Sequence, residues 1–358
     1  MVYPVPGWGK LGERKKIGEG IYPAIAVDDN GTRWVVWWDK NKTEKLRVAW
    51  SDDGRRWEKD FLSHSFFNIY IKRHPSIVWS SLLRKVIVAV RDKKQEAHYH
   101  REIITLFTFD KEDILNSMVD VKEIEVGWTR ISEGEPAVGF ISLSSSNSYS
   151  PFLLYEKGDS LFRMDFPWEE WDTVALYAYH PCAGVREGVW EIGDIEEEGK
   201  VGIYYGDELA GWVEGWAYPV VLEGSEVYVF WEWDGDIYCN ARAQGSWIFR
   251  TFGEKIINTQ ETERSVHAVF SHDKKELYLA YLEGEDVPYR IRFKKIDLSP
   301  SVSVLSPSLY DHNCRHWRIG YPVRISWEVY KSIAPVCSCV VYLHNLNAIP
   351  DGDIKRIG

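Results

Sequence analysis

In six repeats of one short pattern a chemically capable side chain stands directly before a proline that is followed by a small residue. The six head residues are Tyr22, His74, Glu135, His180, Tyr218 and Tyr321. A carboxyl group in a confined place becomes a general acid once burial or a like charge raises its pKa, and imidazole titrates near neutral pH. Because the same dipeptide recurs with different heads, we expect one repeated structural unit to present all of them.

The repeated unit continues with a small residue, usually an aliphatic residue, a turn and a second apolar run. Residues 33–38 and 277–281 are examples of that second run, and residues 266–269 form a degenerate start in which His267 replaces the proline. Proline is tolerated at the first position of a strand, where its missing N–H costs no ladder bond. Four short strands in about 50 residues, repeated, are typical of a β-propeller.

The sequence therefore predicts an all-β protein, a single β-propeller domain over residues 1–358. Seven starts favour seven blades over six. The segment after Tyr321 is too short for four strands with loops, so we expect residues 13–17 to supply the outer strand of the last blade and close the ring. Residues 111–119 form at most a short helix.

The composition agrees with a β-rich chain and limits its partners. The chain has 18 Trp, 20 Tyr and 14 Phe, residue types that favour strands, and a net charge of −11 that argues against a nucleic-acid partner. No apolar run is long enough for a membrane-spanning helix, so no membrane partner is expected. The start lacks a signal-peptide pattern, which indicates a cytoplasmic protein or one secreted with its signal peptide removed. Only three Gln beside many Glu and Lys indicate a thermophilic source.

The cysteines and histidines near the C-terminus do not predict a metal site. This stretch contains Cys314, Cys337, Cys339, His312, His316 and His344. Their spacing matches no recognised zinc site, and buried thiols that pack the last blade are the simpler interpretation. The chain also lacks a phosphate-binding glycine loop, a dinucleotide fingerprint and a nucleophile elbow, so we expect no cofactor.

Residues 22–39 and 47–57 resemble the opening blade of the sialidase-like propellers, the BNR or Asp-box superfamily. Residues 51–57, Ser-Asp-Asp-Gly-Arg-Arg-Trp, resemble an Asp box shortened by one residue. In that family the box is a turn between the third and fourth strands, and it indicates fold rather than chemistry. Sialidases carry an Arg just before the Ile-Pro of the first inner strand, whereas residues 20–23 here read Gly-Ile-Tyr-Pro. The resemblance therefore extends to other glycosidases, uronate lyases and non-catalytic sugar-binding modules.

The geometry of these propellers implies that strand starts and second-strand ends surround one funnel. The catalytic candidates on this face are Glu135, His74, His180, Tyr218 and Tyr321. The substrate-binding candidates are Arg73, Arg264, Arg324, Tyr22, Asp39, Trp231 and Trp233. Each has a structural alternative, such as a solvated carboxylate, a hydrogen-bonded core histidine, a salt-bridged arginine or a packed aromatic ring.

The leading functional hypothesis is a carbohydrate-active enzyme with a glycan or oligosaccharide substrate. Hydrolysis would use Glu135 as general acid with a Tyr or Asp partner, and the resemblance favours Tyr because sialidases use a Tyr activated by a neighbouring Glu. Elimination from a uronate would use a His–Tyr pair, with arginines neutralising the carboxylate. Trp231 and Trp233 would stack on sugar rings. The alternative is a non-catalytic propeller that binds a glycan or a protein.

Overall fold

The structure is a computed structural model. For some strands, or parts of them, it describes the backbone but not the side chains. It describes residues 14–39, 45–62, 74–96, 99–130, 138–146, 149–157, 160–176, 179–183, 189–193, 200–205, 208–214, 216–221, 226–243, 246–247, 254–257, 259–271, 276–297, 301–306, 326–330, 341–344 and 354–357. The chain divides into two compact units, Lys10–Leu298 and a unit that combines Met1–Gly9 with Ser299–Gly358. Each unit is described by itself, and a single domain over the whole chain stays a prediction.

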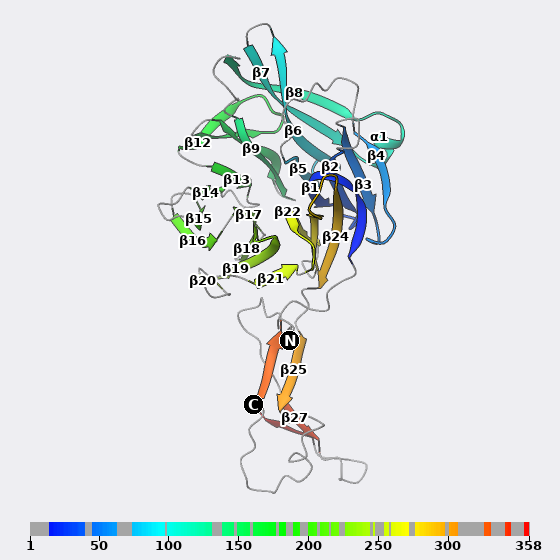
Figure 1. Cartoon of the computed structure of the whole chain (residues 1–358), viewed down its shortest axis with the longest axis vertical. Helices are drawn as coiled ribbons and strands as arrows, with labels where there is room; N and C mark the ends of the chain where they lie inside the picture. Colours follow the sequence, from blue (N-terminus) through cyan, green and yellow to red (C-terminus); the bar gives the residue numbers. More distant parts are fainter. Residues whose placement is uncertain are drawn as a thin grey trace. The chain divides into compact units, whose positions relative to one another are not determined.

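The unit Lys10–Leu298 consists of antiparallel sheets (Figure 1). The first sheet holds β1 (Lys15–Val27), β2 (Arg33–Trp38), β3 (Leu46–Ser51) and β4 (Glu58–Phe61). The second holds β5 (Ser76–Ser80), β6 (Lys85–Glu96), β7 (Tyr99–Phe109) and β8 (Asp120–Arg130), and the third β9 (Val138–Ser146), β10 (Tyr149–Lys157), β11 (Ser160–Asp165) and β12 (Trp171–Leu176). The fourth holds β13 (Tyr179–Ala183), β14 (Val189–Gly193), β15 (Lys200–Tyr205) and β16 (Glu208–Glu214).

The fifth sheet holds β17 (Trp216–Val221), β18 (Glu226–Trp233), β19 (Asp236–Ala243), β20 (Ser246–Trp247) and β21 (Glu254–Ile257). The sixth holds β22 (Glu263–Phe270), β23 (Glu276–Glu283) and β24 (Tyr289–Asp297), and β1 joins it to the first sheet. In the other unit β25 (Ser301–Ser306) pairs with β26 (Ser326–Tyr330), and β27 (Val341–His344) pairs with β28 (Ile354–Ile357).

The repeat located the first strand of every sheet in the unit Lys10–Leu298. The heads up to His267 lie in β1, β13, β17 and β22, or just before β5 and β9. Each first strand contacts the first strands of the two neighbouring sheets, in the cyclic order β1, β5, β9, β13, β17, β22 (Figure 1). The seventh start, at Tyr321, lies outside the described residues. The heads that the structure describes therefore lie in or just before first strands that follow one another in this order.

Strand β1 belongs to two sheets. Its residues 15–20 pair with β24 and its residues 21–27 pair with β2. The sequence placed the outer strand of the last blade at this segment but expected that blade after Tyr321. The observed partner is β24, because the sixth sheet has only three strands of its own and offers β1 an open edge. At Gly20, which has φ +157°, a Cβ atom would lie 2.2 Å from the carbonyl oxygen of Trp38, so no larger residue fits the crossing.

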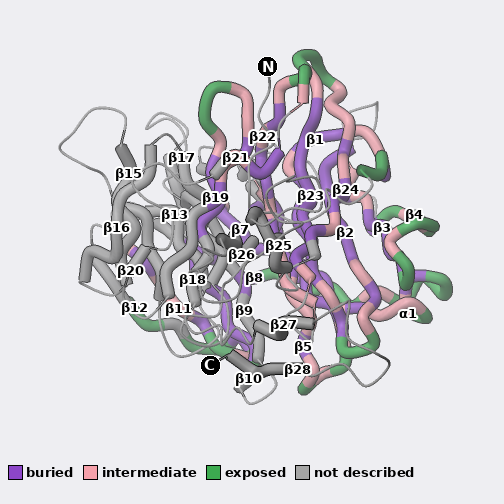
Figure 2. The backbone as a smooth tube through the Cα atoms, turned by 90° about the horizontal axis from the view of Figure 1, so that it is seen from below, coloured by how far each residue is buried: buried purple, intermediate pink, exposed green. Residues whose placement is uncertain are grey.

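The core lies between neighbouring sheets. Trp34, Trp38 and Phe107 pack between the first and second sheets, whereas Trp37 and Tyr278 pack between the sixth and the first. Strand β2 is buried on both faces, which is why it reads as a continuous hydrophobic run rather than an alternation. Figure 2 shows the buried stretches along β1 and β23. Packing between sheets thus explains the tryptophans of β2.

The turn between β3 and β4 has the contacts expected for residues 51–57. The Asp53 carboxylate accepts hydrogen bonds from the backbone amides of Arg55 and Arg56 at 2.7 and 2.8 Å. These amides lower its pKa to about 2. Trp57 donates its indole N–H to the Gly54 carbonyl at 3.1 Å and packs edge-on against Phe293. This turn fixes the edge of the first sheet, and it lies at the end of the strands opposite to Tyr22.

Helix is nearly absent from the described residues. Helix α1 (Lys111–Leu115) lies in the predicted stretch and begins at Asp110, whose side chain and that of Asp113 form a reciprocal cap. Among the described residues no helix has the length and apolar character needed to span a membrane.

Candidate functional site

The backbone bulges where several first strands begin. The register shifts between Ile21 and Ala24 in β1, between Tyr179 and Cys182 in β13, and between residues 264 and 267 in β22. Tyr22 and Ser265 have φ values of +53° and +49° at two of these bulges. A bulge leaves a residue unpaired and turns its side chain out of the regular alternation. The heads in β1, β13 and β22 therefore lie at or beside points where the pairing is irregular, whereas Tyr218 in β17 pairs regularly with Phe230.

At one bulge a carboxyl group meets an arginine. The Ser265 amide, released from the strand ladder, donates a hydrogen bond to Oε2 of Glu232 at 3.1 Å. Glu232 ends the second strand of the neighbouring sheet and is half-buried. Burial raises its pKa more than this amide and the charge of Arg264 lower it. Glu232 therefore keeps its proton to higher pH than an ordinary glutamate, as a general acid requires.

Arg264 is held against an aromatic ring. Its guanidinium carbon lies 5.8 Å from the centroid of the Tyr289 ring, within cation–π range. Its Nε is buried and has no hydrogen-bond partner among the described residues. A buried N–H donor without an acceptor is rare in native structures. The described residues therefore leave this donor unsatisfied.

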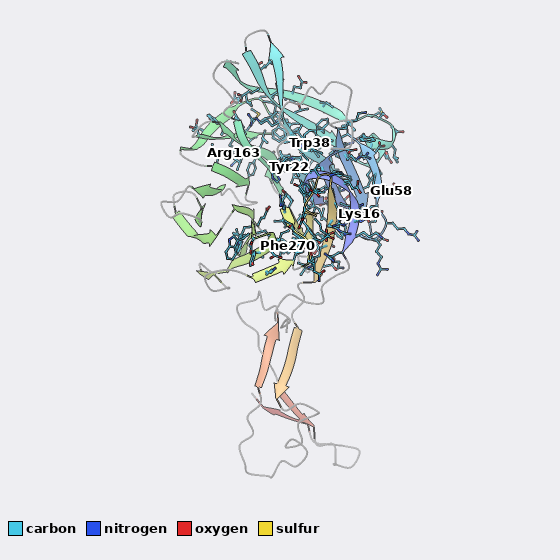
Figure 3. All side chains as sticks on the ribbon, in the orientation of Figure 1. Lys16, Tyr22, Trp38, Glu58, Arg163 and Phe270 are labelled. Atoms are coloured by element: carbon cyan, nitrogen blue, oxygen red, sulfur yellow. The ribbon has the colours of Figure 1, made fainter. Side chains whose placement is uncertain are left out.

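A phenol and an imidazole stack at the next first strand. The ring centroids of Tyr22 and His74 are 4.4 Å apart with their planes tilted by 46°. Tyr22 also packs on the core between the first and second sheets. Figure 3 labels Tyr22 among the inner strands, whereas Lys16 and Glu58 lie at the outer side of the same sheet. The two predicted residues thus lie side by side, each half-buried.

These side chains form one group, which we name the rim cluster. Its members are Glu232, Arg264, Tyr289, Tyr22 and His74. The strands that carry or follow them are neighbours, since β18 contacts β22, β22 contacts β1 and β1 contacts β5. The cluster offers a carboxyl group with a raised pKa, a cation, a phenol and an imidazole along the starts of adjacent sheets. Acid–base chemistry needs such convergence of titratable groups.

His267 holds the two halves of this arc together. Its Nδ1 accepts a hydrogen bond from the Ile25 amide at 3.3 Å, which ties β22 to β1. Desolvation lowers its pKa to about 4, so the imidazole is neutral at pH 7 and remains an acceptor. The residue that replaces proline in the degenerate start is thus an anchor between sheets.

Three further substrate-binding candidates have distinct surroundings. Asp39 is 4% exposed and accepts a hydrogen bond from Nε of Arg47 at 2.6 Å, so its carboxylate serves an ion pair. Trp231 is 1% exposed and stacks on Tyr238, which leaves it no open ring face. Trp233 is 45% exposed and lies 5.7 Å from the same ring. Alternation correctly placed both tryptophans on one face, but only Trp233 is accessible to a sugar.

The remaining candidates are not placed by the structure. Glu135, Arg73, Tyr321 and Arg324 lie outside the described residues. His180 and Tyr218 lie in β13 and β17, and their side chains are not described. Their roles stay predictions. Of the C-terminal cysteines and histidines only His344, at the end of β27, lies within the described residues, and its side chain is not described. Among the described residues no three metal-binding side chains come together.

Sequence reasoning missed Tyr289. It begins a third strand, β24, whereas the repeat marks only first strands. Pro288 precedes Tyr289, but in the repeat the proline follows the head residue. Sequence reasoning also singled out Glu135 as the acid, which lies outside the described residues. Glu232, near the end of a second strand, is a described carboxyl group at the rim whose pKa burial raises.

Comparisons with known proteins bear on the fold. No protein-family model matches the chain, and no curated protein matches it in sequence. An α-L-arabinanase from Penicillium chrysogenum, solved with arabinobiose, is similar with a TM-score of 0.53 at 12% identity, over 79% of this chain and 98% of that one. A protein of unknown function from Dyadobacter fermentans has a TM-score of 0.50 at 11% identity, over 79% and 99%.

A Trypanosoma rangeli sialidase mutant that displays trans-sialidase activity has a TM-score of 0.50 at 10% identity, over 81% of this chain. The fold is that of the sialidase-like β-propellers. The chain spans 58% of the length of that sialidase, and at these identities the similarity concerns the fold alone. Each sheet therefore corresponds to a blade, and the rim cluster lies where the first strands of neighbouring blades begin.

Proposed function

We propose that the unit Lys10–Leu298 is a six-bladed propeller closed by β1. The first strands contact one another in a cycle of six, and the shared strand joins the sixth blade to the first. The fourth sheet has four strands of its own, β13 to β16, as a full blade requires. The preference for seven blades rested on the start at Tyr321, which belongs to the other unit.

We infer that this propeller is a carbohydrate-active enzyme, a glycoside hydrolase or a uronate lyase, with the rim cluster as its site. The observation that carries the proposal is the raised pKa of Glu232 beside Arg264, in an arc that also contains Tyr22 and His74. The similarity to an arabinanase and a sialidase supports it at the level of the fold.

Each reaction assigns definite roles to these side chains. In hydrolysis Glu232 would protonate the oxygen of the leaving sugar. Glu135 was expected in this role and stays a second candidate for it. In elimination His74 or Tyr22 would remove the proton next to the uronate carboxylate, while Arg264 binds that carboxylate. Trp233 would stack on a neighbouring sugar ring.

Two product assays on a panel of neutral and acidic polysaccharides test the proposal. New reducing ends without ultraviolet absorbance would indicate hydrolysis, and new reducing ends with the absorbance of a double bond would indicate elimination. The E232Q variant should lose turnover in the first case, and H74A or Y22F in the second. The exposed loop variant E285Q is the matched control. No product from any polysaccharide, or full activity in all three site variants, would contradict the proposal.

A binding module is the second candidate, and Trp233 is the observation in its favour. Its exposed ring beside Tyr238 provides a stacking platform that needs no acid or base. This candidate expects glycan affinity without turnover, loss of affinity in W233A and no change in E232Q.

A further inference from the structure

A second group of charged side chains, the junction cluster, lies between the fifth and sixth blades. Its members are Glu263, Glu283, Asp236, Arg14, Arg292 and Lys294. Glu263 and Glu283 lie opposite each other on β22 and β23, and they are 0% and 2% exposed. Two buried carboxyl groups in such positions ionise together only if other charges compensate them.

Glu283 is the compensated member of the pair. Nη1 of Arg14 lies 2.8 Å from its Oε1, and Arg292 donates to its Oε2. Nε of Arg290 lies 3.4 Å from the same Oε2, and Arg290 also pairs with Glu261. Both oxygens of Glu283 thus face guanidinium groups, which compensate a negative charge on this carboxyl group.

Glu263 lacks such compensation. Thr259 donates its hydroxyl to Oε1, and Oε2 is buried with no hydrogen-bond partner among the described residues. Burial is the main cause that raises the pKa of Glu263, to about 7, and the charges of Asp236 and Glu283 raise it further. The Thr259 hydroxyl and Arg14 lower it. At neutral pH this carboxyl group is close to half protonated.

The other charged groups that face Glu263 are already engaged. Lys294 is buried, donates to the Ile256 carbonyl at 2.9 Å, and has a pKa lowered to about 8 by burial. Lys255 pairs with Asp236. The Tyr281 phenol is also buried on this side of β23, and burial raises its pKa. Lys294 keeps further N–H donors, but no described cation donates a hydrogen bond to the second oxygen of Glu263.

Backbone hydrogen bonds connect Glu263 to the rim cluster. Its amide donates to the Gly235 carbonyl at 2.7 Å, in the turn that follows Glu232 and Trp233. The Gly284 amide, in the loop that leads to β24, donates to the Thr262 carbonyl at 2.9 Å. The segment just before Arg264 is thus held to two turns that border the site.

We propose that Glu263 is a pH-dependent latch, which in its protonated form holds these turns against the start of β22 and on ionisation releases them. An ionised carboxylate with an unpaired oxygen in a dry site is costly, and a local opening that admits water relieves this cost. The latched form dominates below the pKa of Glu263, and the open form gains as pH rises through it.

Hydrogen exchange of the segments that contain the Glu263 and Gly284 amides tests the latch without any substrate, so its outcome is independent of the proposed function. Wild type, E263Q and the exposed-loop control E285Q are compared between about pH 5 and pH 8, after correction for intrinsic exchange. We expect protection in wild type and E285Q to fall about tenfold or more across this range, and protection in E263Q to stay constant. An equal fall in E263Q, or no fall in wild type, would overturn the proposal.

A second variant decides the question if E263Q does not fold. T259V removes the hydroxyl that lowers the pKa of Glu263. The loss of protection should then move to higher pH than in wild type. An unchanged transition would overturn the latch.

Discussion

Glu232 and Glu263 are carboxyl groups on neighbouring blades, and burial raises the pKa of both. Glu232 is half-buried and lies beside Arg264, whose Nε has no described partner. Glu263 is fully buried and lies opposite a carboxylate that arginines already compensate. A raised pKa therefore indicates possible catalysis only where a ligand can reach the group.

The two clusters should respond differently to substitution. Glu232 and Arg264 of the rim cluster are only half-buried, so their loss should change chemistry or affinity more than the free energy of unfolding. In the junction cluster Glu283 is buried and paired with arginines, so its loss leaves charges unpaired. The predictions below test this division.

The largest expected difference between the clusters is in turnover. On a substrate found by the polysaccharide panel, E232Q should reduce kcat by about 10²- to 10⁴-fold, the usual contribution of a general acid. E263Q should leave kcat nearly unchanged at acidic pH. Because a general acid acts in its protonated form, the wild-type rate should fall as pH rises past the pKa of Glu232. Equal losses of kcat in both variants would remove the distinction.

Stability should show the opposite order. E283Q leaves the guanidinium groups of Arg14 and Arg292 without their carboxylate, and we expect a loss of about 3–5 kcal/mol in the free energy of unfolding. The matched control is E261Q, because Glu261 pairs with Arg290 at the surface, where ion pairs contribute about 0–1 kcal/mol. Denaturant unfolding measures both. Similar losses in the two variants would show that burial is not what matters here.

The pH dependence of stability isolates Glu263. Its pKa is about 7 in the folded protein and 4.5 in the reference state, so folding binds a proton between these values. The contribution of protonated Glu263 to the free energy of unfolding is therefore fully present below about pH 4.5. As pH rises to about 7, the free energy of unfolding falls by about 3 kcal/mol. Subtracting the E263Q curve from the wild-type curve removes the other titrating groups. A flat difference curve would contradict this assignment.

Local patterns explain why much of the fold could be predicted from the sequence. A proline at the strand start, a turn and an apolar run encode each blade within about 50 residues, so all six first strands of Lys10–Leu298 were located. The partner of residues 15–20 was not, because β24 is distant in sequence and only the unfilled edge of the sixth blade selects it. The blade count depended on that pairing.

The site was predictable to a lesser extent. Tyr22 and His74 were found because they precede the repeated proline, and their rings do meet. The position of Glu263 opposite Glu283 depends on a bulge in β22, which alternation along the strand does not reveal. Alternation also grouped Trp231 with Trp233, but packing against the neighbouring strands decided that only one is exposed. Register and packing are set by the whole fold rather than by local sequence.

The smallest expected stability change is at Arg264. Its cation–π contact with Tyr289 should contribute about 0.5–1 kcal/mol, so R264Q should lower the unfolding midpoint slightly and leave the denaturant slope unchanged. R292Q makes the same substitution in the junction cluster, where it withdraws a donor from buried Glu283, and should cost about 1–3 kcal/mol. Under the proposed function affinity should change in the opposite order, because no described residue satisfies Nε of Arg264, whereas Arg292 is hydrogen-bonded to Glu283. If R264Q destabilised the protein as much as R292Q and left glycan affinity intact, Arg264 would be a structural residue and the rim cluster would lose its only described cation.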